Sequence, residues 1–257
     1  MSLRRASTVC VVRDNDGVEV LMVRRPLTAR FMPGAWVFPG GAVDEEDVAA
    51  PPSFGPQGEE HDWKVAALRE LIEETGLWVT TEGVVKNDLV EDAFEVVEQS
   101  DLVLDPGALT YFANWITPRV FPIRFDTRFF LAVADPGTGA SVDGDELIDH
   151  DWVTPTEALR REVDREWDVS FPTRKILISL ASAVSVDDLV ERLSAVGEIP
   201  AIEPRLFVGE NEAKILLPDE AGFDEAGPAQ DDPTILERLS AVVAQEGTVP
   251  AEFKSRS

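Results

Sequence analysis

Two valine-rich runs stand near the start of the chain, within the segment STVCVVRDNDGVEVLMVRR. They lie on either side of Asp14, Asn15, Asp16 and Gly17, residues that favour a tight turn. Two such runs around such a turn predict a β-hairpin. The next segment, RRPLTARFMPGAWVFPGG, has proline and glycine at short intervals, and it predicts a loop of defined shape.

Helical periodicity begins further on. Residues 63–75 predict a helix, and Gly76 is well placed to end it. Residues 45–62 hold Pro51, Pro52 and Pro56 among acids and glycines, so we expect a flexible insertion there. Residues 87–99 predict another helix.

The rest of the chain alternates between segments with strand periodicity and segments with helical periodicity. RFDTRFFLAVAD predicts a strand, and TPTEALRRE and PTRKILISLASAV predict helices. After about residue 184 we expect a helix, a hairpin at 205–218, a linker at 219–233 and a last helix from Thr234. Strands that alternate with helices indicate a layered α/β or α+β domain.

The predicted helix at 63–75 carries its glutamates on one face and its large apolar side chains on the opposite face. With about 100° per residue and Glu70 at 0°, Glu73 falls at about 300° and Glu74 at about 40°. The branched residues Val65, Leu68 and Ile72 fall on the opposite face. Ala66 and Ala67 flank the acids, and their small side chains should leave room for a ligand.

The composition and net charge exclude several classes of function. The 257 residues are 44% hydrophobic, enough for a real core, and carry 49 acids against 23 bases, a formal charge of −26. This charge argues against nonspecific binding to nucleic acid or to an anionic membrane. One cysteine excludes an internal disulfide, and the first residues show no apolar leader. We therefore expect a cytoplasmic protein.

The three glutamates have two explanations. In so acidic a chain, an amphipathic helix with its charges in water is the ordinary one. The other explanation is a metal site. The neighbouring Gly40 and Gly41 favour it, because such a turn offers close backbone approach and free carbonyls. Clustered carboxylates and carbonyl oxygens suit Mg²⁺ or Mn²⁺.

These residues carry a family resemblance. The run from Arg69 to Leu77, RELIEETGL, is similar to the second half of the Nudix box, R-E-U-x-E-E-x-G-U with U apolar, and FPGG at 38–41 resembles its opening. The usual box has no room for the 14 extra residues between Gly41 and Arg69. Its first glutamate therefore has three candidates here, Glu46, Asp47 and Glu60, and the sequence does not choose among them.

A second resemblance lies upstream. LMVRRPLTARFMPGAWVFPGG is similar to the signature of coenzyme A (CoA) diphosphatases, L-L-T-x-R-(S/A)-x3-R-x3-G-x3-F-P-G-G. Arg25, Arg30 and Gly34 fall on fixed positions of that signature, whereas Met22, Val23 and Pro26 depart from it. A box split by an insertion resembles the Nudix motif 19 type of this group.

The resemblance implies a fold and the boundaries of the domain. We expect an α/β protein, a Nudix α/β/α sandwich with a mixed sheet, plus a C-terminal helical and hairpin extension. The Nudix hydrolase domain would span 1–183, with the insertion at about 45–62. Residues 184–257 would form the extension, packed on the same domain.

The resemblance also implies chemistry. A bound Mg²⁺ or Mn²⁺ would have Glu70, Glu73, Glu74 and the Gly40 carbonyl as ligands. Glu70, Glu73 and Arg69 would be the catalytic set, with Arg69 orienting the glutamates. Arg25 and Arg30 would bind the phosphates of a small nucleotide substrate.

Three functions remain open at this stage. The first is hydrolysis of CoA or acyl-CoA to 3′,5′-ADP and (acyl-)4′-phosphopantetheine. The second is a Nudix hydrolase for ADP-ribose, NADH or another dinucleotide. The third is a Nudix-shaped binding or regulatory module without turnover, which the intact Arg69 and glutamates argue against. A homodimer is left open as the oligomeric state.

Other conspicuous residues have ordinary explanations. His61 and His150 are too isolated for a ligand set, and Trp115, Phe129 and Phe130 fit a strand core better than a base-stacking site. The basic residues Arg124, Arg128, Arg174 and Lys175 are candidates for phosphate contacts without a spacing argument.

Overall fold

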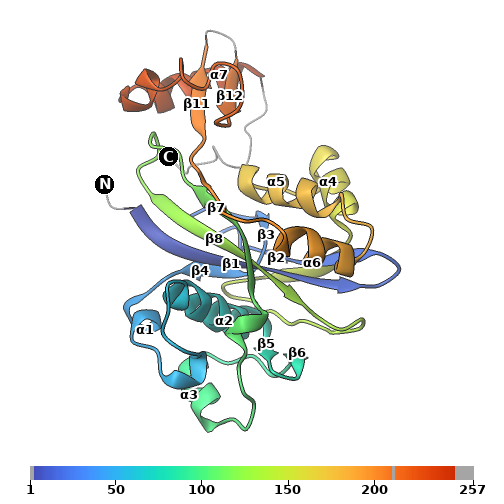
Figure 1. Cartoon of the computed structure of the whole chain (residues 1–257). Coiled ribbons are helices and arrows are strands. Elements are labelled where there is room, and N and C mark those ends of the chain that lie inside the picture. Colours follow the sequence, from blue (N-terminus) through green and yellow to red (C-terminus); the bar gives the residue numbers. More distant parts are fainter. Residues whose placement is uncertain (1–2, 210–211, 247–257) are drawn as a thin grey trace.

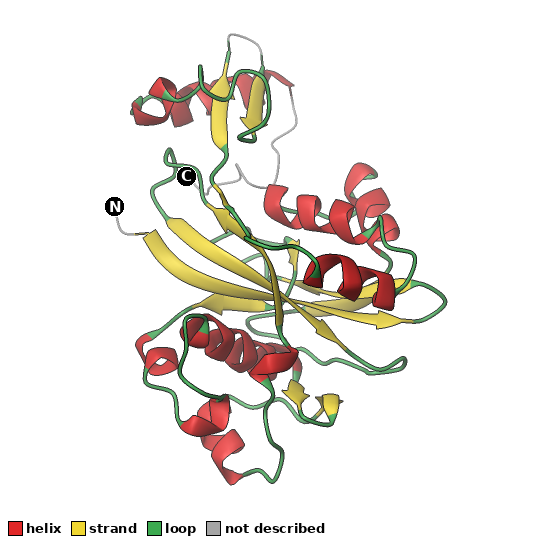
Figure 2. Ribbon diagram, in the orientation of Figure 1, coloured by secondary structure: helices red, strands yellow, loops and turns green. Residues whose placement is uncertain are grey.

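The computed structural model describes residues 3–209 and 212–246, and a mixed β-sheet forms its centre (Figures 1 and 2). The strand order is β10-β7-β8-β1-β2-β3, with β4 paired to β1 and β9 to β2. The strands of this sheet are β1 (Leu3–Asp14), β2 (Val18–Arg24), β3 (Trp36–Val37), β4 (Gly40–Ala42), β7 (Thr110–Ile116), β8 (Arg124–Val133), β9 (Asp149–Val153) and β10 (Ala201–Ile202). Two small hairpins complete the strands, β5 (Leu77–Thr80) with β6 (Gly83–Lys86) and β11 (Arg205–Val208) with β12 (Ala213–Leu216).

Helices lie on both faces of the sheet, which confirms the expected α/β/α sandwich (Figure 1). One face carries α1 (Glu45–Val48), α2 (His61–Thr75) and α3 (Ala93–Gln99). The other carries α4 (Pro155–Val163), α5 (Phe171–Leu180) and α6 (Val186–Ser194). The remaining helical segments are α7 (Ile235–Glu246) and the short 3₁₀ turns η1 (Pro52–Phe54), η2 (Pro106–Ala108) and η3 (Pro228–Asp231).

Strand β1 contributes side chains to two hydrophobic cores, one on each face of the sheet. Successive side chains of a strand point to opposite faces. Val9 and Val11 therefore join the core under α2, whereas Cys10 and Val12 join the core under α4 to α6. The predicted hairpin is confirmed, with Asp14 opposite Val18 at its closed end. Because β1 is buried on both faces, its apolar run is nearly continuous rather than alternating.

Most of the insertion lies at the surface, but the expectation that it is a flexible segment throughout is wrong, because two of its residues are anchored in the protein. Asp47 in α1 and Phe54 in η1 are each completely buried. The Phe54 ring lies 4.7 Å from that of Phe94, between ring centroids. A segment that places an aromatic ring in the main core contributes to stability, in spite of its prolines.

Two other boundaries differ from expectation. The helix predicted at 87–99 begins only at Ala93, where Asp92 caps it by accepting a hydrogen bond from the Glu95 amide. The segment 219–233 is more than a linker, since it holds η3. Within η3, the buried Gln230 side chain exchanges hydrogen bonds with the Leu206 backbone.

The C-terminal part divides between two places. Val186 and Leu189 of α6 pack into the core of the sandwich. The hairpin β11–β12 and α7 stand off one end of the sheet around a small core of their own, formed by Leu206, Val208, Ile235 and Leu239 (Figure 1). The domain limits at 183 and 184 stay a prediction.

The longest described helix is α2, with 15 residues. No helix in the described ranges combines the length and the apolar character that a membrane crossing needs.

Candidate functional site

Helix α2 carries the predicted acids, and it lies against β1 and β4. Val65, Leu68 and Ile72 are fully buried in the core, as the helical periodicity predicted. Gly76 ends the helix in a left-handed conformation, with φ of 66°. Ala66 and Ala67 are also fully buried, so the expected free space beside them is filled by protein.

The Gly40–Gly41 turn fits closely under the acidic end of α2. The Gly40 amide donates a 2.8 Å hydrogen bond to Glu74 Oε2. A Cβ atom at Gly40, where φ is 147°, would lie 2.2 Å from the Ser7 carbonyl oxygen. One at Gly41 would lie 2.1 Å from Glu70 Oε1. At Gly40 only glycine permits the approach, and a side chain at Gly41 would displace the Glu70 carboxylate, so the turn and the two glutamates form one unit.

Arg69 holds this unit together from the side. Its Nε and Nη2 donate to the two oxygens of Asp47, at 2.8 and 3.1 Å. Its Nη1 lies 3.0 Å from Glu70 Oε1 and donates to Glu73 Oε2 at 3.2 Å. A guanidinium that bonds three carboxylates fixes their positions, which is the arrangement that an orienting role requires.

Asp47 is the acid that the structure brings to Arg69. The sequence left Glu46, Asp47 and Glu60 as equal candidates, although Asp47 has the usual distance from Gly41. In the structure Glu46 is exposed, and Glu60 pairs with Lys64 at 3.5 Å instead. Asp47 is fully buried against Arg69. The distance from Gly41 was the signal that could have selected it.

Glu73 differs from the other two glutamates. Its Oε1 accepts a 2.9 Å hydrogen bond from the Ala93 amide at the beginning of α3, and its Oε2 accepts from Arg69. Both oxygens are therefore engaged by the protein. Glu70 and Glu74, one helical turn apart, are the pair that faces the Gly40–Gly41 turn.

Burial changes the acidity of that pair. It raises the pKa of Glu70 to about 7, although the adjacent Arg69 opposes the shift. It also raises the pKa of Glu74 well above the usual range, helped by the charge of Glu70 and opposed by the Gly40 amide. Two carboxylates that share a buried place with too little positive charge favour protonation, or a cation beside them.

The donor set fits a divalent metal in its chemistry. Glu70 and Glu74 offer hard carboxylate oxygens, and Gly40 offers a backbone carbonyl at the start of β4. Within the described ranges, no three acidic, histidine or cysteine side chains already converge into a complete metal cage.

Only one of the two signature arginines lies near the acids. Arg25 is close enough to Glu74 to lower the pKa of that carboxyl, and its Nε donates to the Phe31 carbonyl at 3.1 Å. Arg30 is exposed and makes no hydrogen bond or ion pair with the residues that the structure describes. Glu146, which no motif indicated, also acts on Glu74 and raises its pKa.

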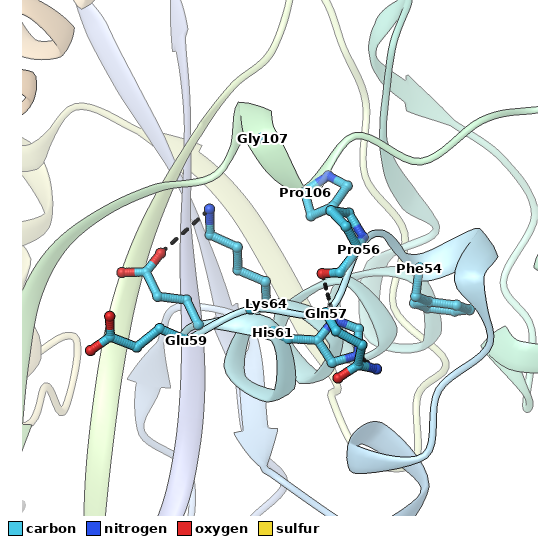
Figure 3. A pocket seen from close by; sticks show the side chains of 10 residues that line it. Phe54, Pro56, Gln57, Glu59, His61, Lys64, Pro106 and Gly107 are labelled. Carbon is cyan, nitrogen blue, oxygen red and sulfur yellow. Dashed lines mark hydrogen bonds and ion pairs between the residues drawn. The ribbon is translucent and has the colours of Figure 1, made fainter.

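A cavity of about 430 Å³ opens at the other end of α2 (Figure 3). The insertion supplies most of its wall, with Lys64, Pro106 and Gly107. Within it, His61 is buried and its ring bonds the Gln57 side chain and the Pro56 carbonyl, a structural role as expected. This cavity contains none of the three glutamates, so it is separate from the acidic site.

Comparison with known proteins agrees with this geometry. Residues 3–172 match the model of the NUDIX domain. Putative nudix hydrolase 7 of Caenorhabditis elegans is 29% identical over 75% of this chain and 65% of its own length. The human acyl-coenzyme A diphosphatase NUDT19 is 24% identical over 68% of this chain and 63% of its own length. The matched regions thus span just under two thirds of these relatives.

A solved structure extends the likeness to three dimensions. The NUDIX hydrolase of Alicyclobacillus acidocaldarius superposes with a TM-score of 0.62 and 30% identity. That match covers 78% of this chain and 99% of the other. The glycine turn, the Arg69 cluster and the paired glutamates lie inside the matched domain, and the chain belongs to the Nudix family.

Proposed function

We propose that this protein hydrolyses the diphosphate bond of CoA or acyl-CoA, with Mg²⁺ or Mn²⁺ as cofactor. The observation that carries the proposal is the close grouping of Glu70, Glu74 and Arg25 around the Gly40–Gly41 turn. A carboxylate pair short of positive charge suits a metal, and an arginine beside it suits the phosphates.

The reaction adds water across one phosphoanhydride bond. The water oxygen joins one phosphorus, the bridging P–O bond breaks, and two phosphomonoesters leave, 3′,5′-ADP and (acyl-)4′-phosphopantetheine. A bound divalent cation would supply charge neutralisation and activation of the water.

Each residue has a distinct part in this scheme. Glu70, Glu74 and the Gly40 carbonyl would hold the metal, and Glu73 would assist from its place beside α3. Glu70 also accepts the proton from water. Arg69 orients Glu70 and Glu73 through the contacts at 3.0 and 3.2 Å. Arg25 binds a phosphate by contacts that lysine would reproduce poorly.

The CoA assignment rests on two supports besides the acids. The signature from Leu21 to Gly41 resembles that of CoA diphosphatases. The relatives from Homo sapiens and Xenopus laevis are named acyl-coenzyme A diphosphatases, at 24% and 27% identity.

A substrate screen tests the proposal. CoA, dephospho-CoA, acyl-CoA, ADP-ribose and NADH are each incubated with Mg²⁺ and with Mn²⁺, and the products are identified by mass. We expect 3′,5′-ADP from CoA. Efficient cleavage of ADP-ribose or NADH without cleavage of CoA would replace this function with the dinucleotide one. No turnover of any compound would favour a binding module.

The arginines are tested by alanine and lysine variants. Because Arg25 lies near Glu74, Arg25→Ala should raise KM for CoA and for dephospho-CoA alike, as expected for a contact to the diphosphate. Arg30→Ala should raise KM for CoA more, if Arg30 reaches the 3′-phosphate. Unchanged KM values in both variants would remove these residues from the substrate site.

A further inference from the structure

Large apolar side chains are exposed where the loop 26–35 meets the beginning of β8. Phe31 is 48% exposed and Ile123 is 55% exposed. The Phe31 ring packs on Phe125, with 6.0 Å between centroids. Phe125 is half-buried, and Ile123 stands two residues before it in the chain. We refer to Phe31, Ile123 and Phe125 as the apolar patch, two of whose side chains stay exposed although their burial would be favourable.

The same loop joins this patch to the acidic site. The Phe31 carbonyl accepts the 3.1 Å hydrogen bond from Arg25, and Arg25 acts on Glu74. Arg30, which has no acidic partner among the described residues, precedes Phe31 directly. A ligand that meets this loop therefore encounters positive charge and apolar surface together.

The strand register measures the separation. Gly40 lies opposite Thr8, and Thr8 lies opposite Phe129 of β8. Phe125 is four residues before Phe129, or about 13 Å along the strand, and two strand spacings add about 10 Å across the sheet. The Phe125 backbone is therefore about 16 Å from that of Gly40.

This separation matches one part of CoA. About thirteen bonds join the outer phosphorus to the thioester sulfur, and an extended chain of that length spans about 15 Å. With the diphosphate at the acids, a chain of this length is long enough to follow the loop 26–35 to Phe31, which that loop joins to Arg25, and an acyl chain on the sulfur would begin there.

A second copy of this chain is a poorer occupant. A stable interface needs about 800 Å² from each partner. Three partly exposed side chains, each of about 150–250 Å² or less, supply only a fraction of that area. Arg4 stacks on Phe125, 5.7 Å from the ring centroid to Cζ, so positive charge also borders the patch.

We propose that Phe31, Ile123 and Phe125 form the contact surface for the acyl chain of an acyl-CoA substrate. This inference rests on the proposed function, and it predicts a preference for acyl-CoA over free CoA. Phe31 is the central residue, because its backbone is tied to Arg25 and its ring to Phe125.

Selectivity is the quantity to measure. The ratio of kcat/KM for octanoyl-CoA to that for CoA is compared in the parent, Phe31→Ser, Phe31→Leu and a matched control, Ile178→Ser. Ile178 lies on α5 with the same 48% exposure as Phe31. We expect the ratio to fall about tenfold in Phe31→Ser, the usual scale for lost apolar contacts in a pocket. Phe31→Leu should recover most of it, and Ile178→Ser should keep it.

Binding gives a second readout. Calorimetry in EDTA, where no hydrolysis occurs, should show the Kd of octanoyl-CoA rising in Phe31→Ser while that of CoA changes little. An unchanged ratio in Phe31→Ser, or an equal loss in Ile178→Ser, would overturn the inference. So would a dimer of the parent that dissociates in Phe31→Ser, because a second copy would then cover the patch. If the parent cleaves neither CoA nor octanoyl-CoA, the proposed function is wrong, and this inference, which rests on it, is wrong as well.

Discussion

Two arginines of this protein each gather three carboxylates, one inside the molecule and one on its surface. Arg69 contacts Asp47, Glu70 and Glu73 at 3.2 Å or less, with Asp44 further away at 4.0 Å, and its side chain is 11% exposed. Arg160 on α4 contacts Glu157, Asp164 and Glu166, and its side chain is 48% exposed. The two clusters resemble each other in their close ion pairs and differ in their access to water.

Their acids respond in opposite directions. Burial raises the pKa of Glu70 to about 7. Hydrogen bonds from Arg160 and Arg161 lower the pKa of Glu157 to about 2. Inside the protein, desolvation exceeds the attraction of one guanidinium, whereas in water the attraction acts without that cost. A surplus of buried carboxylates is the feature that distinguishes a candidate metal site from an ordinary surface cluster.

The largest expected difference concerns the two arginines. Arg69→Met should destabilise the fold by about 3–5 kcal/mol, because it leaves the buried Asp47 without its partner. Arg160→Met should cost far less, because water replaces its contacts. Urea unfolding of both variants and the parent measures the difference. Equal losses in the two variants would show that burial does not separate these clusters.

The second difference concerns turnover. Glu70→Gln and Glu74→Gln should each lower kcat by about 10² or more, the scale of losing a strong transition-state contact, while leaving the fold intact. Glu157→Gln makes the same change in the surface cluster and should leave kcat unchanged. Near-normal rates in both site variants at saturating Mg²⁺ would contradict the assignment.

The third difference is a pH dependence without metal. The pKa of Glu70 is higher in the folded protein than its ordinary value of 4.5. Its protonation therefore contributes stability that is full below about pH 4.5 and is lost as pH rises toward 7. In EDTA, Tm should fall between pH 5 and 8, and added Mg²⁺ should restore it. Glu70→Gln should flatten this limb, and a parent whose Tm rises over that range would disprove the sign.

The smallest expected difference is a pH dependence of opposite sign, caused by Glu157 in the surface cluster. The lowered pKa of Glu157 gives stability that is present above the unfolded pKa and is lost as pH falls toward 2. Solvent screens this exposed group, so only a slight change is expected. Parent and Glu157→Gln should unfold alike at pH 2, and the parent should be marginally more stable at pH 6. A large gap at pH 6 would mean that exposure does not weaken the cluster.

The sequence predicted the helical acids because their spacing is local. Helical periodicity put Glu70 and Glu74 on one face, and the preference for glycine after a helix placed its end at Gly76. Periodicity could not select Asp47, because the insertion separates it from Arg69, and only its distance from Gly41 distinguished it from Glu46 and Glu60. Phe54 was missed because its proline-rich surroundings suggest a surface loop, while its burial depends on the distant Phe94. The roles of the site residues remain predictions until the variants are measured.

The ten-residue parallel pairing of β1 with β8 has a consequence for synthesis. Leu3 lies opposite Arg124, and the pairs continue to Val12 opposite Val133, so each partner is 121 residues away. At about 5–20 residues per second, a ribosome needs about 6–24 s to make the missing strand. During that time β1 can close its hairpin with β2, but its other edge presents unpaired backbone groups beside a valine-rich surface. The nascent chain is then most exposed to aggregation, and recovery from denaturant should be limited by the same distant pairing.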